Sequence, residues 1–184
     1  MAYSRRMETT QAAERAMSGW LGALGKAGLI DGETDAATVL AQYVVGEDGL
    51  ASLRDYMAGA SREVRDRERR AAIEVCIWMV HADRQVDPEE VALLREIIGR
   101  SGLSDDEQDE LVAESHEPPS LEGIEERLTH PVLRELLLAL AWELASIDGT
   151  VANAERDFFT GLSKRLGVSP ARASEIQRAV TQRV

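Results

Sequence analysis

Apolar residues recur along this chain at intervals of three and four positions, the spacing that places side chains on one face of an α-helix. Such stripes are formed by Ile73, Cys76, Ile77 and Val80, by Val91, Leu94, Ile97 and Ile98, by Phe158, Phe159, Leu162 and Leu166, and by Ala173, Ile176 and Val180. Residues 132–145 (VLRELLLALAWELA) are apolar nearly all round, which predicts a helix at the centre of the protein. No segment shows the alternation of a strand. The pattern therefore predicts an all-α helical bundle of about seven to nine helices.

Helix start and stop signals agree with these segments. Residues 87–90 (DPEE) and 104–107 (SDDE) each combine an N-cap residue with a glutamate three positions later, the capping box. Ser169 is followed by Pro170, a cap with proline at the first helical position. Gly102 and Gly167 fall where the preceding helices should end. The mixed run at residues 62–70 (REVRDRERR) is typical of a solvated helical face.

The most informative feature is an internal repeat with an offset of 65 residues. Each copy reads as a helix, a short acidic loop, a helix and then a glycine–apolar–serine restart. The copies span residues 71–104 and 136–169, and two such hairpins are expected to pack together because neither buries its apolar side alone. The shift of 65 carries Asp83 to Asp148, Val86 to Val151, Glu90 to Glu155, Ile97 to Leu162, Gly102 to Gly167, Leu103 to Val168 and Ser104 to Ser169.

The repeated pattern, apolar-Asp-x-x-Val-x-x-x-Glu ending in Gly-Leu-Ser, resembles the tellurite-resistance TerB-like helical domain family. The resemblance covers about residues 70–184, so we expect a TerB-like domain there and an N-terminal helical extension over residues 1–69. It implies a role in bacterial chemical-stress or phage-defence systems and acidic residues that bind a divalent cation. Oxygen ligands suit Ca²⁺, Mg²⁺ or Mn²⁺. No organic cofactor is expected. The metal ligands that the resemblance implies are Asp83, Glu90, Asp148 and Glu155.

The chemistry of these loops suits such an ion. Carboxylate oxygens are the ligands that hard divalent cations prefer. Each loop supplies an aspartate, and the first turn of the next helix supplies a glutamate. The four carboxylates can converge if the hairpins pack about a pseudo-two-fold axis. Neither loop has the length or the alternating donors of an EF-hand.

The two copies differ in how strongly they support a metal site. Asp83 is followed by Arg84, whose guanidinium can neutralise it, whereas Asp148 precedes a glycine as in the family. Glu90 is also explained as a capping-box residue, and Glu155 has no such capping partner because Ala152 stands at that position. A purely structural role for these acids therefore stays open beside the cation site.

The charge of the chain restricts its partners. Asp and Glu number 33 against 21 Lys and Arg, a formal net charge of −12, which opposes binding of nucleic acid or anionic lipid by the whole molecule. Residues 104–126 hold ten carboxylates and no Lys or Arg. This acidic connector is either a solvated surface or a docking surface for a basic protein partner. The second reading gives an alternative function: a metal-free acidic helical adaptor or scaffold.

Other chemistry is sparse, and no enzymatic activity is expected. A single cysteine, Cys76, excludes an internal disulfide framework and a Cys-based zinc site. The chain has no P-loop, nucleophile elbow or Glu-x-x-His pair. His81 is best explained as a helix C-cap, and Trp78 and Trp142 as packing residues on buried helices.

The location of the protein follows from the lack of long apolar runs. None is long enough to span a bilayer, and no signal peptide is recognisable, so we expect a cytoplasmic protein. The resemblance implies a place at the inner face of the membrane and a membrane-associated protein partner. Residues 16–30 are expected to form a docking helix on the main body, with a position on the membrane surface as the alternative. Homo-oligomerisation is left open.

Overall fold

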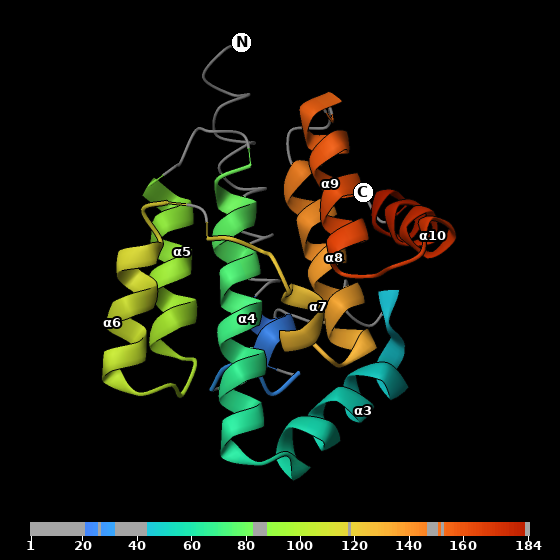
Figure 1. Cartoon of the computed structure of the whole chain (residues 1–184). Helices are drawn as coiled ribbons and strands as arrows, with labels where there is room; N and C mark the ends of the chain where they lie inside the picture. The colour runs from blue at the N-terminus through green and yellow to red at the C-terminus, as the bar shows by residue number, and fades with distance from the viewer. Residues whose placement is uncertain are drawn as a thin grey trace.

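The computed structural model describes residues 21–25, 27–31, 44–82, 88–117, 119–146, 151 and 153–182 of the 184-residue chain. All regular structure in these ranges is helical, without a strand (Figure 1). The expected all-α fold is therefore confirmed. The helices are α3 (Gly46–Gly59), α4 (Arg62–Val80), α5 (Pro88–Gly99), α6 (Asp105–Glu114), α7 (Ile124–Arg127), α8 (Pro131–Ala145), α9 (Asn153–Arg165) and α10 (Pro170–Thr181).

The 65-residue repeat extends to a third helix. The first residues of α5 and α9 are 65 positions apart, as are those of α6 and α10 and the last residues of α4 and α8. α4 contacts α5, and α8 contacts α9, so both expected hairpins form. The chain thus contains two copies of a three-helix unit, α4–α5–α6 and α8–α9–α10. The hairpin loops at residues 83–87 and 147–150 lie outside the described residues, and with them Val86, while Val151 is half-buried against the core.

The third helix of each unit begins at the expected serine. The Ser104 hydroxyl accepts a hydrogen bond from the backbone N–H of Glu107, whose carboxylate accepts one from the Ser104 N–H at 3.0 Å. The Ser104 hydroxyl also donates to this carboxylate at 2.6 Å, and this bond, together with the one from the Ser104 N–H, holds the pKa of Glu107 below its usual range. Ser169 caps α10 by accepting from the Arg172 N–H at 3.2 Å. The capping box at residues 104–107 and the serine–proline start are both confirmed, whereas Asp87 and the side chain of Glu90 in the other expected box lie outside the described residues.

A glycine covered by an arginine precedes each of these caps. Gly102 and Gly167 have φ angles of +70° and +66°, the left-handed conformation that glycine adopts without strain. A Cβ at Gly102 would lie 2.9 Å from Nη1 of Arg69, and a Cβ at Gly167 would lie 3.3 Å from Nη1 of Arg134. Arg69 and Arg134 are themselves 65 positions apart. The repeat therefore preserves this packing as well as the helices.

The expected central helix is α8. It contacts α3, α4, α9 and α10, and residues 136–140 are completely buried. Near its end, the Trp142 ring lies edge-on to Phe159 with centroids 4.9 Å apart, and Nε1 of Trp142 donates to the Thr181 hydroxyl at 3.2 Å. Figure 1 shows α5 and α6 on one side of α4 and α7, α8 and α9 on the other.

The N-terminal segment packs on this body where it is described. Leu24, Leu29 and Ile30 are buried, and Asp31 exchanges two hydrogen bonds with Arg100 at 2.6 and 2.8 Å. Residues 21–25 are helical, in agreement with the expected docking helix, whereas Trp20 lies outside the described residues. None of the described helices has the length and apolar character needed to cross a membrane.

Candidate cation site between the two hairpins

The structure describes only one of the four predicted metal ligands in full. Asp83 and Asp148 lie in the loops outside the described residues, and Glu90 lies in the first turn of α5 with its side chain also outside them. Glu155 lies in the first turn of α9 and is half-buried. Within the described ranges, no group of three His, Cys, Asp or Glu side chains is arranged to hold a metal ion. The four-carboxylate site stays a prediction.

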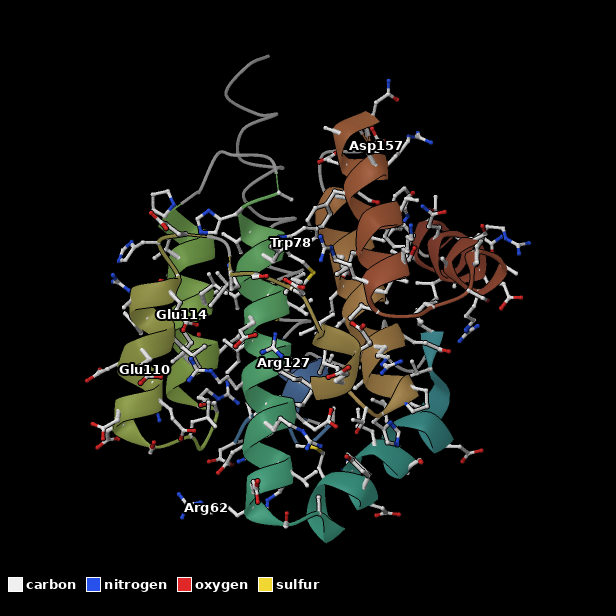
Figure 2. All side chains as sticks on the ribbon, viewed as in Figure 1. Arg62, Trp78, Glu110, Glu114, Arg127 and Asp157 are labelled. Carbon is white, nitrogen blue, oxygen red and sulfur yellow. The ribbon has the colours of Figure 1, made fainter. Side chains whose placement is uncertain are left out.

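The helices that carry the two loops end on the same side of the molecule. Figure 2 shows Arg62 and Trp78 toward opposite ends of α4, with Trp78 toward the end that leads into the first loop. Asp157 lies near the start of α9, which follows the second loop, on that same side. The helix ends that flank the two acidic loops therefore lie at one end of the bundle.

An aromatic pair joins the two hairpins at this end. The rings of Trp78 on α4 and Phe158 on α9 stack with centroids 4.4 Å apart and planes 23° apart. Both side chains are half-buried and pack against the core. Glu155 precedes Phe158 by three residues, a spacing that places both on one helix face. The carboxylate of Glu155 thus belongs to the face of α9 that meets α4.

Sequence reasoning did not find this contact between the hairpins. It assigned Trp78 to packing on a buried helix, whereas the ring is half-buried and contacts the second hairpin. The repeat gives no signal for the stack, because the position 65 after Trp78 is Glu143 and the position 65 before Phe158 is Leu93. The interaction joins two positions that are not equivalent in the repeat.

His81 fixes the point at which the first loop begins. It is the C-cap residue of α4, as expected, and its backbone N–H donates to the carbonyl of Ile77. Its Nε2 lies 2.9 Å from the backbone oxygen of Ser115, just after α6. The start of the loop is therefore attached to α6 as well as to α4.

Part of the acidic connector is bound to α4 by one arginine. The guanidinium of Arg70 donates to Glu110 at 3.0 Å, to Glu114 at 2.9 Å and to Glu74 at 3.3 Å, and Arg127 of α7 pairs with the other oxygen of Glu74 (Figure 2). These ion pairs hold α6 and α7 against α4. Two carboxylates of the connector are thus used within the molecule.

The second unit makes an equivalent contact with the charges reversed. Position 70 corresponds to Glu135 on α8, which accepts from Nε and Nη2 of Arg172 on α10 at 3.1 and 2.7 Å. In both units, an ion pair therefore joins the first helix to the third.

Replacing Arg70 with methionine is expected to lower the free energy of unfolding by about 1 kcal/mol, because water screens the exposed partners Glu110 and Glu114 and the buried Glu74 keeps its pair with Arg127. Urea unfolding should show that the loss shrinks as salt is added. Arg62→Met is the control, since Arg62 forms one exposed pair with Asp66 on the same helix. Equal losses in both variants, or no dependence on salt, would contradict a network that holds α6.

Comparison with known families identifies the first part of the chain. Residues 25–113 match the family model described as Tellurite resistance protein TerB. No curated protein and no solved structure shows significant similarity to the chain. The matched range includes α3, α4, α5 and most of α6, and it ends before the second unit.

The match and the expected domain overlap over residues 70–113. The match also begins inside the segment expected to be an N-terminal extension, and the division between residues 69 and 70 stays a prediction. The expected resemblance to the TerB family is confirmed over residues 25–113.

Proposed function

We propose that this protein is a non-enzymatic TerB-like module of a bacterial stress response, in which one divalent cation joins the two helix–loop–helix hairpins. Its ligands are Asp83 and Glu90 from the first hairpin and Asp148 and Glu155 from the second. The oxygen donors suit Ca²⁺, Mg²⁺ or Mn²⁺. The role in stress response rests on the family resemblance, whose members take their name from tellurite resistance.

The observation that carries this proposal is the stack of Trp78 on Phe158. Trp78 lies two residues before the end of α4, and Phe158 lies in the second turn of α9. Their stack therefore holds together the helix ends that flank the two loops. Loops that leave from adjacent helix ends can place their carboxylates around a shared ion. Glu155 lies three residues before Phe158, a spacing that puts both residues on the same face of α9.

A cation bound between the two loops would fix how the two repeated units are arranged. Carboxylates from two loops repel each other when they are close, so the unbound hairpins resist approach at this end. A bound cation supplies the positive charge that the four carboxylates share. The residues of both loops then hold the two three-helix units at a fixed angle, and a protein partner can recognise this arrangement.

Glu155→Gln is expected to abolish any gain in melting temperature caused by Ca²⁺ or Mn²⁺, whereas Glu90→Gln should remove only part of it. The difference follows from Arg84, which can neutralise the first half of the site. An ion that binds only the folded state stabilises it by about 2.7 kcal/mol at a hundredfold excess over its dissociation constant. Thermal unfolding with and without the cation measures this gain.

Asp157→Asn is the matched control, because this residue is exposed on the same helix and loses the same charge. It should keep the full cation-dependent gain. If wild-type protein shows no shift at millimolar Ca²⁺ or Mn²⁺, or if Asp157→Asn loses as much as Glu155→Gln, the shared-cation function is rejected.

A metal-free acidic adaptor is the second candidate. Glu110 and Glu114 are bound by Arg70, but Asp105, Asp106 and Asp109 are exposed on α6 and form no ion pair with any residue that the structure describes. A basic protein could bind these three carboxylates with electrostatic steering. Changing the three aspartates to lysine should then abolish a salt-sensitive interaction without altering the response to cations.

A further inference from the structure

A second candidate site lies at the other end of α4. A cavity of about 450 Å³ opens between residues 25–31, α3 and α4. Its lining includes three arginines and one acidic residue, together with apolar side chains: Arg54, Arg65, Arg69, Asp31, Ile30 and Met57. None of the proposed cation ligands contributes to it. Its volume is within the range of small-molecule pockets.

Two of these arginines have an unusual spacing in the sequence of α4. Arg65 and Arg69 are four residues apart, so two like charges share one helix face, which opposes helix stability. The same helix uses this spacing differently elsewhere, because Arg62 pairs with Asp66 and Arg70 pairs with Glu74. The cavity therefore faces a stripe of this helix on which two arginines are four residues apart.

The guanidinium N–H groups of these two arginines form few hydrogen bonds with the described residues. Nη1 of Arg65 donates to the Ala60 carbonyl at 3.0 Å, and Nη2 of Arg69 donates to the Gly28 carbonyl at a long 3.4 Å. Neither guanidinium forms an ion pair with any of the described residues, in a chain with 33 acidic side chains. In addition, the buried Nε of Arg69 has no hydrogen-bond partner among the residues that the structure describes.

At the equivalent position of the second unit, an arginine has hydrogen-bond acceptors for its guanidinium donors. Arg134, 65 residues after Arg69, also covers a glycine through Nη1. Its Nε donates to the carbonyl of Leu128, and its Nη2 donates to the carbonyl of Glu125. Arg69 lacks the first of these bonds and borders an open cavity instead. The two units therefore differ in the hydrogen bonding of the arginine that borders the cavity.

We propose that this cavity binds a small phosphorylated molecule. Arg65 and Arg69 form no ion pair with any described residue, so their two guanidinium groups can face an anionic ligand in this cavity. A phosphate monoester carries between about −1.5 and −2 charges at pH 7. Guanidinium groups bind phosphate oxygens through paired N–H donors, and Ile30 and Met57 offer an apolar wall for the organic part of the ligand.

Isothermal titration calorimetry of the full chain with ribose 5-phosphate tests the proposal, with ribose and inorganic phosphate as the reference ligands. Wild type should bind ribose 5-phosphate, and inorganic phosphate should compete, whereas ribose should not bind. Arg65→Gln should weaken binding at least about tenfold, because it removes a charge-assisted hydrogen bond. Ala58→Glu, at an exposed position in the cavity wall, should weaken it similarly by placing a carboxylate there.

Arg62→Gln is the matched control, because it removes the same charge three residues away and does not line the cavity. It should bind as wild type does, and so should Glu155→Gln, because the cation site is separate. Equal weakening by Arg62→Gln would show general electrostatic attraction and overturn the proposal. So would the absence of binding at millimolar ligand, or binding only to vesicles that contain phosphatidic acid.

Discussion

Replacing Glu68 with alanine is expected to lower the free energy of unfolding by about 3 kcal/mol, because a fully buried carboxylate then leaves several donors without an acceptor. Glu68 accepts from the Tyr56 hydroxyl at 3.1 Å and from the Thr129 backbone N–H at 3.0 and 3.1 Å, and it also accepts from the Thr129 hydroxyl. These bonds join α3, α4 and the turn before α8. Urea unfolding measures the loss.

Two controls separate this carboxylate from ordinary surface charge. Tyr56→Phe removes one of the hydrogen bonds and should lower the free energy of unfolding by about 1 kcal/mol. Glu63→Ala removes an exposed glutamate from the same helix and should stay within about 0.5 kcal/mol of wild type. A loss for Glu68→Ala no larger than that for Glu63→Ala would show that the cluster does not stabilise the fold.

Leu137→Ala in α8 is expected to lower the free energy of unfolding by about 3 to 4 kcal/mol. The side chain is completely buried, and its helix contacts α3, α4, α9 and α10. Its removal therefore leaves a cavity that the surroundings fill only in part. Guanidinium unfolding should show the change as a lower midpoint with an unchanged slope.

Val132→Ala, half-buried on the same helix, is the comparison and should lower the free energy of unfolding by about 1 kcal/mol. Similar losses of free energy at both positions would show that Leu137 is not at the centre of the core. The equivalent of Leu137 in the first unit is Ala72, which is also buried, so α8 carries the larger side chain at this position.

The helices could be predicted from the sequence because burial of apolar stripes determines them. The stripes on α4, α5, α9 and α10 and the apolar α8 all face the core. The start of α6 was also predicted, because its capping box is local. The third helix of the repeat was not recognised, because α6 is acidic and α10 carries arginines. Beyond the capping serines, the repeat of this helix is visible in Leu111 and Ile176, which are 65 residues apart and both buried.

Contacts between distant segments could not be predicted in this way. The interpretation of residues 62–70 as a solvated face was wrong for Glu68, which is fully buried. Its partners Tyr56 and Thr129 lie on other elements, and no local pattern announces them. The same holds for the stack of Trp78 on Phe158, on which the proposed cation site depends. The loops that carry the predicted ligands stay a prediction from the repeat.

Calorimetric titration of the metal-free chain with Ca²⁺ and with Mn²⁺ tests the central claim most directly, because it counts the ions. Carboxylates from both hairpins that share one ion predict a stoichiometry of one per chain for at least one of these cations, and weaker binding in both Asp83→Asn and Asp148→Asn. A stoichiometry of two would mean that each loop binds its own ion. That result, or the absence of binding at millimolar concentrations of both cations, would contradict a cation shared between the hairpins.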